Sequence, residues 1–213
     1  GASFAGGFVE RANAALDACP SMEGLDLASV VSTDTAYEWG PTGAAHHIVA
    51  YDYGIKRNIL RLFEEEGCRV TVVPSDTPAD EALKYKPDGV FFSNGPGDPA
   101  AVTYAPETIR AIANSEVPVF GICLGHQLIA LSFGGSTRKL PYGHRGGNHP
   151  VKEMDTGRVL ITSQNHGFAV DGDEAGIPGA PKLEVTHVNL NDQTIEGLRH
   201  TELPVFAVQY HPE

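Results

Sequence analysis

From about residue 46 onward, short apolar runs alternate with stretches whose apolar residues recur every three or four positions. The runs predict buried strands and the recurring stretches predict helices, because side chains repeat every two residues in a strand and about every 3.6 in a helix. The predicted strands cover 48–51, 69–73, 89–92 and a run from 118; the predicted helices cover 52–67, 78–85, 106–114 and the stretch up to 134. Repeated β-α units of this length favour a mostly parallel sheet.

Beyond residue 134 the pattern changes to short strands separated by turns. These strands are predicted at 151–153, 159–163, 183–189, 194–198 and 204–210, and they favour an antiparallel extension of the sheet. The sequence therefore predicts an α/β fold with a mostly parallel central sheet, helices on both faces and an antiparallel extension.

The first 45 residues have a different pattern. An alanine-rich stretch from Ala5 to Ala18 predicts a helix that Pro20 ends, and Pro41-Thr-Gly-Ala44 is typical of a linker. We expect residues 1–45 to be a remnant and linker that follow a missing N-terminal domain, and residues 46–213 to form one domain.

Charge and cysteine content narrow the function classes. The 213 residues include 27 acidic and 15 basic ones, a net charge of −12, which opposes binding to nucleic acids and anionic membranes. There is no apolar run long enough to cross a bilayer and no signal-peptide pattern, so we expect a cytoplasmic protein. Cysteines at 19, 68 and 123 form neither a disulfide framework nor a zinc-binding spacing.

Candidate chemistry centres on Gly121-Ile-Cys123-Leu-Gly125, where the predicted strand turns sharply into a helix. The two glycines suit a strained turn that brings backbone segments close together, and the arrangement is that of a nucleophile elbow. A helix N-terminus favours an anion, so we expect a lowered pKa for Cys123. Without the flanking glycines, a small buried apolar residue would be the simpler interpretation of a free cysteine.

A candidate base lies at the end of the sequence, in His211-Pro-Glu213. Side chains two residues apart in an extended chain point the same way, so Glu213 can fix the tautomer of His211, which can take the proton of a cysteine. A solvated strand end is the alternative for this spacing alone. Similarly, Ser93–Pro99 is either a tight turn or a backbone donor to an oxyanion, opposite the N–H of Leu124.

Gly121-Ile-Cys-Leu-Gly-His-Gln127 with the downstream His-Pro-Glu resembles the class I (triad) glutamine amidotransferases, a flavodoxin-like family that hydrolyses glutamine to glutamate and ammonia. Further motifs look like those of the small subunits of carbamoyl-phosphate synthases: Val49–Ile59, Ser93–Pro99, Gly143–Val151 and Ser163–Phe168. The resemblance covers 46–213. Residues 21–33 also look like the segment that joins the N-terminal domain of such subunits to their amidotransferase domain.

The resemblance implies roles for individual residues. Cys123 would be the nucleophile, His211 the base and Glu213 the residue that orients the base. The glutamine contacts would be Gly95, Gly97, Leu124, Gln127, Asn165, Gly167 and Phe168. In the family a serine of the N-terminal domain also contacts glutamine, and this sequence does not include it. No metal-ligand spacing links His126, His144 and His149, so we interpret these three as structural and expect no metal site.

The resemblance also implies a partner. Ammonia would pass to the large synthetase subunit of a heterodimeric carbamoyl-phosphate synthase, which serves arginine and pyrimidine biosynthesis. No Gly-x-x-x-x-Gly-Lys-[Ser/Thr] loop is present, so we expect no cofactor on this chain and ATP and Mg on the partner. The alternatives are the amidotransferase of anthranilate, GMP or CTP synthesis, which the motif at 143–151 disfavours, and a stand-alone γ-glutamyl peptidase. The complete Cys, His and Glu set disfavours a non-catalytic regulatory module.

Overall fold

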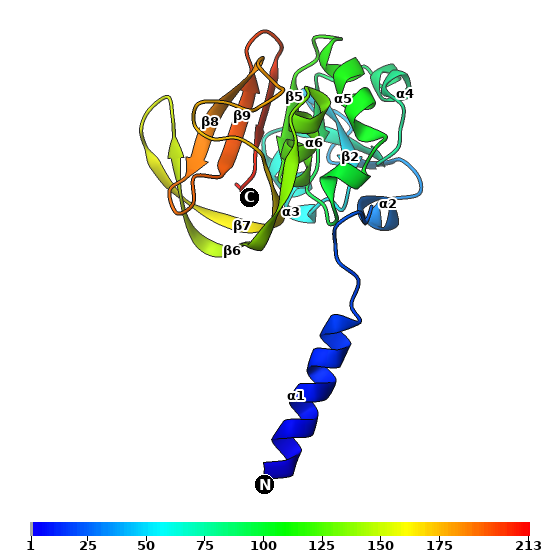
Figure 1. Cartoon of the computed structure of the whole chain (residues 1–213). Helices are drawn as coiled ribbons and strands as arrows, with labels where there is room; N and C mark the ends of the chain where they lie inside the picture. Colours follow the sequence, from blue (N-terminus) through cyan, green and yellow to red (C-terminus); the bar gives the residue numbers. More distant parts are fainter. Residues whose placement is uncertain (1) are drawn as a thin grey trace.

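A computed structural model describes residues 2–213, with side chains described from residue 7 onward. In this part of the chain ten strands form one sheet with the order β1-β3-β2-β4-β5-β10-β9-β8-β6-β7. Figure 1 shows this sheet with the helices packed beside it and α1 extending away. The strands are β1 Tyr37–Trp39, β2 His46–Asp52, β3 Cys68–Pro74, β4 Gly89–Phe92, β5 Val119–Ile122, β6 Thr137–Glu153, β7 Val159–Val170, β8 Leu183–Asn189, β9 Ile195–His200 and β10 Val205–Val208. The helices are α1 Ala2–Asp17, α2 Ala28–Val31, α3 Arg57–Glu65, α4 Ala79–Lys84, α5 Ala105–Ala113, α6 Leu124–Ser132 and the short 3-10 helix η1 Pro99–Ala101.

The sheet has a parallel centre and an antiparallel extension. β3, β2, β4, β5 and β10 run parallel, whereas β1 at one edge and β9, β8, β6 and β7 on the other side pair antiparallel. The predicted fold class is therefore confirmed. One strand joins the two halves differently than expected: the predicted strand 204–210 is β10, which runs parallel to β5 and antiparallel to β9.

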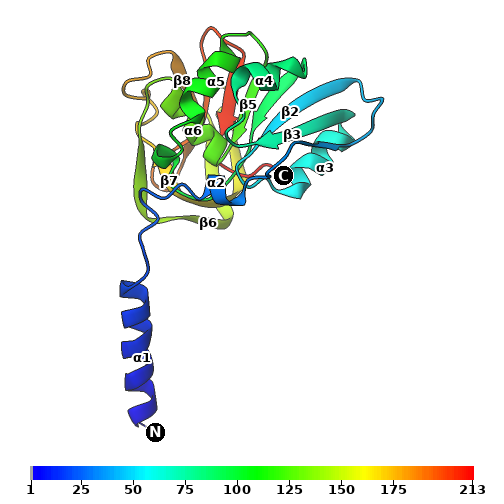
Figure 2. The same cartoon turned by 90° about the vertical axis from the view of Figure 1, so that its right-hand side faces the viewer.

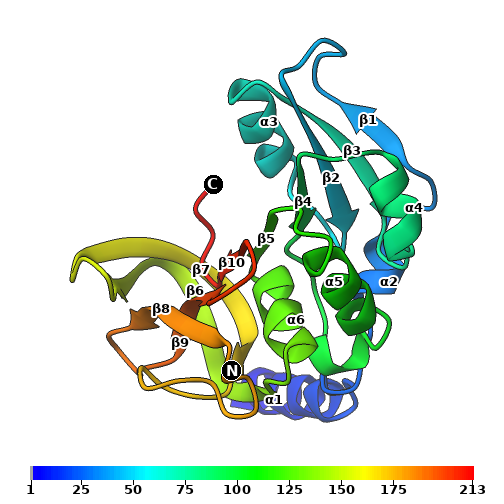
Figure 3. The same ribbon diagram turned by 90° about the horizontal axis from the view of Figure 1, so that it is seen from above.

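Helices cover both faces of the parallel strands (Figure 3). Because successive strand residues point to opposite faces, Tyr51 and Phe92 pack in the core under α4, α5 and α6, and their neighbours Ala50 and Phe91 pack in the core under α3. The rings of Tyr51 and Phe92 stack with their centroids 4.8 Å apart. These two cores fix the carboxyl ends of the parallel strands, where open α/β sheets bind their ligands.

The helix predicted from residue 52 begins later, at Arg57, because Asp52 holds the preceding loop. Its Oδ1 accepts hydrogen bonds from the backbone N–H groups of Gly54 and Ile55, both at 2.9 Å. Gly54 has φ 116°, a conformation that does not continue into a helix. The residues between β2 and α3 therefore form a loop at the carboxyl edge of the sheet.

β6 and β7 form a long hairpin, of which the sequence predicted only the parts at 151–153 and 159–163. The pairing of the two strands shifts register at two places. Gly143 and Gly146 adopt positive φ angles of 68° and 107° in β6. Bulges and glycines interrupt the alternation of side chains, so the pattern of a half-buried strand is lost from the sequence there.

The N-terminal helix α1 extends away from the sheet (Figure 2). The segment after it packs on the domain: Ala28 in α2 is fully buried, and the carbonyl of Leu25 accepts a hydrogen bond from the N–H of Asp98 at 3.0 Å. The boundary at residue 45 stays a prediction, although β1 adds residues 37–39 to the sheet. None of the described helices combines the length and the apolar character that a bilayer crossing requires.

Candidate active site

Cys123 lies between the end of β5 and the start of α6, in a strained backbone conformation. Its φ of 55° and ψ of −101° lie outside the regions that L-residues normally occupy. The N–H of Cys123 donates to the carbonyl of Val208 at 2.9 Å, and the N–H of Gly125 donates to that of Ser93 at 3.1 Å. β10 and the loop after β4 thus hold the turn, as such strain requires.

The glycines of this turn leave no room for a side chain. A Cβ on Gly125 would overlap the carbonyl oxygen of Phe92, and a Cβ on Gly121 would overlap the backbone of Gly125. The geometry of the elbow therefore depends on both residues lacking a Cβ, as the sequence pattern predicted.

We expect Gly125→Ala to lower the free energy of unfolding by about 3 kcal/mol, because the overlapping atom belongs to a backbone that cannot move aside. Urea denaturation measures this. Gly147→Ala is the matched control, since a Cβ there meets nothing within 4 Å, and it should change the free energy of unfolding by less than about 0.5 kcal/mol. Equal losses in the two variants would contradict the close packing of the turn.

A cavity of about 300 Å³ lies beside Cys123. Six of the seven predicted glutamine contacts line it, namely Gly95, Gly97, Gln127, Asn165, Gly167 and Phe168. The seventh, Leu124, has its side chain in the core, and its backbone N–H faces the sulfur of Cys123. His211 lines the same cavity, so the structure brings the predicted nucleophile and the predicted base to one space.

Glu213 holds His211 from the side of Nδ1. The distance from His211 Nδ1 to Glu213 Oε1 is 2.9 Å. A carboxylate only accepts, so Nδ1 carries the proton and Nε2 of the neutral ring is left as an acceptor. Burial acts to raise the pKa of Glu213, but hydrogen bonds from His211, its own backbone and Lys56 outweigh burial and bring this pKa to about 2.

Lys56 is a third member of this arrangement that the sequence did not single out. Its Nζ lies 3.0 Å from Glu213 Oε1 and 3.1 Å from His211 Nδ1. The ammonium therefore shares one carboxylate oxygen with the imidazole N–H and keeps that oxygen charged. The sequence did contain a signal for Lys56, because this residue belongs to the motif Val49–Ile59. Its contact with His211 and Glu213 could not be predicted, because it depends on how the fold places the loop after β2.

Both amide hydrogens of Gln127 are donated to other groups of the protein. Its Nε2 donates to the carbonyl of Phe168 and to Gln209 Oε1, both at 2.8 Å. Its Oε1 is therefore the atom left for a donor on a ligand, such as an ammonium group. The carbonyl oxygen of Asn165, which also lines the cavity, lies 4.0 Å from Cys123 Sγ.

Residues 49–213 match the family model for class-I glutamine amidotransferases. The chain belongs to this family. Two curated relatives are carbamoyl phosphate synthase small chains: that of Rubrivivax gelatinosus is 55% identical over 96% of this chain and 56% of its own length, and that of Chlorobaculum tepidum is 58% identical over 92% of this chain and 53% of its own length. The chain thus spans about half the length of the curated relatives it matches.

Solved structures show the same fold for this amidotransferase. A protein from Thermoplasma acidophilum described as a putative GMP synthase component aligns with a TM-score of 0.65 at 24% identity, covering 78% of this chain and 84% of that one. A glutamine amidotransferase from Thermotoga maritima aligns with a TM-score of 0.61 at 17% identity, covering 78% and 75%. At these identities the similarity describes the fold.

The pKa of Cys123 is raised in this amidotransferase, to about 12, because the side chain is buried. The N–H of Leu124 and the charge of Lys56 act in the opposite direction but do not outweigh burial. The predicted lowering of this pKa is therefore wrong, since desolvation of the sulfur exceeds the effect of the helix terminus. At neutral pH the sulfur is a thiol, so it needs a base to become a nucleophile.

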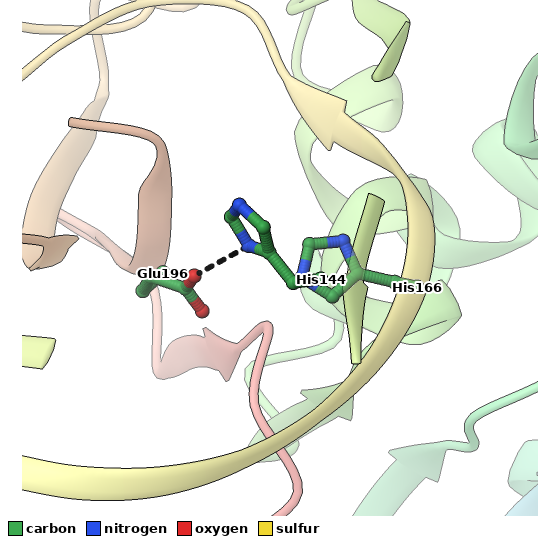
Figure 4. Close-up of side chains that lie close together, drawn as sticks. All are labelled: His144, His166 and Glu196. Carbon is green, nitrogen blue, oxygen red and sulfur yellow. Dashed lines mark ion pairs between the residues drawn. The ribbon is translucent and has the colours of Figure 1, made fainter. Parts of the chain in front are cut away.

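Three side chains near the cavity form a cluster that no local spacing predicted (Figure 4). His144, His166 and Glu196 come from β6, β7 and β9, and their ligand atoms lie within 4.8 Å of one another. Of the histidines interpreted as structural, His126 is fully buried, and the ring of His149 lies 5.0 Å from that of His144, centroid to centroid. Of these, only His144 joins the cluster.

Proposed function

We propose that the chain hydrolyses glutamine to glutamate and ammonia, with Cys123 as nucleophile, His211 as base and Glu213 as the residue that orients the base. One observation carries the proposal: a cysteine on a strained strand-to-helix turn shares a cavity with a histidine whose Nδ1 is held by a carboxylate at 2.9 Å. This is the arrangement that a cysteine nucleophile requires.

The reaction follows from the proton positions. His211 Nε2 takes the proton of the Cys123 thiol as Sγ attacks the γ-amide carbon of glutamine. When the tetrahedral intermediate collapses, the C–N bond breaks, His211 returns the proton to the leaving nitrogen, and ammonia departs. Water, deprotonated by the same ring, then cleaves the γ-glutamyl thioester and restores the thiol. The N–H of Leu124 and a backbone N–H of the Gly95–Gly97 loop are the proposed donors to the oxyanion.

Other residues of the cavity would contact the rest of the substrate. Gly95, Gly97, Asn165, Gly167 and Phe168 would form its walls, and Gln127 Oε1 would accept from the α-ammonium of glutamine. Glu213, charged down to about pH 2, stabilises the imidazolium that forms during the attack.

We further propose that the ammonia serves a large synthetase subunit that makes carbamoyl phosphate for arginine and pyrimidine biosynthesis, with ATP and Mg bound on that partner. The relatives that carry the name carbamoyl phosphate synthase small chain support this partner. Ammonia released to water at neutral pH is protonated and lost as a nucleophile, so hydrolysis is useful only next to an acceptor site.

The test compares glutamine hydrolysis with and without a partner. We expect slow hydrolysis and no carbamoyl phosphate from this chain alone. Where a partner completes the catalytic geometry, a small misplacement of the catalytic groups in its absence can lower the rate about a hundredfold. A full-length form of the chain with a synthetase subunit, ATP and bicarbonate should hydrolyse glutamine severalfold faster than without the subunit. Hydrolysis near about 10 s⁻¹ without any partner would contradict this, and cleavage of γ-glutamyl peptides would then favour a peptidase.

A further inference from the structure

Glu196 is a fully buried carboxylate in β9, and its surroundings favour its charge. Its Oε2 accepts from Gln164 Nε2 at 2.8 Å and its Oε1 accepts from Asn189 Nδ2 at 2.9 Å. His144 Nδ1 lies 3.5 Å from Oε1 (Figure 4), and the other nitrogen of this ring lies 2.8 Å from Asp192. Burial acts to raise the pKa of Glu196, but these contacts hold it below its ordinary value. Such a charge is kept in a core only where its partners are fixed.

Gln164 connects this carboxylate to the wall of the cavity. Its Nε2 faces Glu196, so its Oε1 faces His166, at 2.9 Å from Nε2 of the ring. An amide oxygen accepts, so this hydrogen bond requires a proton on His166 Nε2. On the other side of the ring, His166 Nδ1 lies 2.7 Å from the carbonyl oxygen of Phe168, a second acceptor. Burial lowers the pKa of His166 to about 4, so near pH 7 the ring has one N–H and can donate to only one of the two oxygens. The Phe168 oxygen already accepts from Gln127, which favours donation to Gln164. His166, Phe168 and Gln127 all line the cavity.

Backbone contacts tie the same strands to the base. The carbonyl of Glu196 accepts from the N–H of Gln209 at 2.8 Å, and the side chain of Gln209 accepts from Gln127. In β7, the carbonyl of Ser163 accepts from the N–H of His211 at 2.9 Å. In β7, Ser163 thus holds the backbone of His211, and the residues after Gln164 line the cavity.

Two histidines and a carboxylate also suit a divalent metal ion, but most of the ligand atoms here already contact protein groups. Both ring nitrogens of His166 lie within 2.9 Å of protein oxygens, and both oxygens of Glu196 accept hydrogen bonds from protein amides. His144 Nδ1 is the atom of the cluster without a hydrogen bond among the described residues. A metal ion on Glu196 Oε2 or on His166 Nε2 would have to displace Gln164, so hydrogen bonding is the better account.

We propose that Glu196 is a positioning residue for glutamine. Its carboxylate orients the amide of Gln164, whose oxygen draws the single ring proton of His166 to Nε2 in competition with the Phe168 carbonyl, and this holds the cavity wall formed by His166, Phe168 and Gln127. The effect on glutamine binding rests on the proposed function. The effect on the position of the His166 proton does not.

The test replaces Glu196 by glutamine in the 213-residue chain. The Asn189 amide is held by the N–H of Asn191, which donates to its Oδ1 at 3.0 Å, so Asn189 Nδ2 keeps the new amide oxygen on its side. The new N–H₂ then faces Gln164, which turns over and presents its own N–H₂ to His166 Nε2. Nitrogen-15 NMR of histidine-labelled protein, assigned with a His166→Asn variant, should show the Nε2 proton of His166 in the parent chain and its loss in Glu196→Gln. The KM for glutamine should rise roughly tenfold while kcat falls less than about threefold.

Glu184→Gln is the matched control, because Glu184 is a half-exposed carboxylate in the neighbouring strand β8; it should change neither the NMR signals nor the KM. If Glu196→Gln does not fold, Gln164→Met removes the same link and should also release the Nε2 proton. A folded Glu196→Gln with an unchanged His166 proton and KM would overturn the proposal. So would a co-purifying metal ion whose removal by EDTA shifts the His166 signals. The expected NMR result in a chain that does not hydrolyse glutamine would contradict the proposed function alone.

Discussion

Replacing Cys123 by alanine should lower the rate of glutamine hydrolysis at least about a thousandfold. The thioester cannot form without the sulfur, and no other described cysteine lines the cavity. Ammonia release, measured on the full-length form with the synthetase subunit, ATP and bicarbonate so that the parent rate is high, reports the loss. The fold should be retained, because the alanine side chain is smaller than that of cysteine and fits the same turn.

Cys68→Ala is the matched control for this variant. Cys68 is also a buried cysteine, but it begins β3 at the opposite end of that strand from the ligand-binding edge. Its replacement should leave the rate within about twofold of the parent. Comparable losses in the two variants would mean that hydrolysis depends on the fold around a thiol and not on Cys123 as nucleophile.

Replacing His211 by asparagine should lower kcat about a thousandfold, and Glu213→Gln should lower it less, about a hundredfold. A buried thiol with a pKa of about 12 cannot lose its proton near pH 7 without a base. Glu213 never carries that proton; it selects the tautomer. In Glu213→Gln, Lys56 remains 3.1 Å from Nδ1 and can donate to it, which favours the tautomer that has its proton on Nε2 and cannot accept from the thiol.

A second variant separates these roles. Adding Lys56→Met to Glu213→Gln removes the competing donor, so the double variant should recover part of the rate that Glu213→Gln loses. Steady-state kinetics of the single and double variants measure the recovery. Equal and complete loss in His211→Asn and Glu213→Gln, with both folded, would give Glu213 a role beyond orientation; a double variant slower than either single variant would contradict the tautomer account of Lys56.

The predictable parts of this fold are those whose cause is local. β4 covers 89–92 as the sequence predicted, because a short apolar run between turn residues is typical of a fully buried strand. The elbow at Cys123 was predictable for the same reason, since two glycines around a cysteine mark a turn that no side chain fits. His211 and Glu213 meet because they are two residues apart in an extended chain.

The parts that escaped prediction depend on residues far apart in the sequence. Lys56 contacts His211 across 155 positions, and Glu196 meets Gln164 across 32. The predicted lowering of the Cys123 pKa was wrong because burial, a property of the assembled core, raises this pKa more than the helix terminus lowers it. Periodicity shows which residues are buried on one element. It does not show which side chains from different elements share a site.

Peptide mapping after covalent labelling tests the central claim most directly. A diazoketone analogue of glutamine should modify Cys123 alone, glutamine should protect against it, and hydrolysis should be lost in step with the label. Iodoacetamide near neutral pH should instead modify the exposed Cys19 first, because Cys123 is a buried thiol until a substrate-shaped molecule reaches its cavity. Loss of hydrolysis with the analogue on Cys68, or with no label on Cys123, would contradict the account.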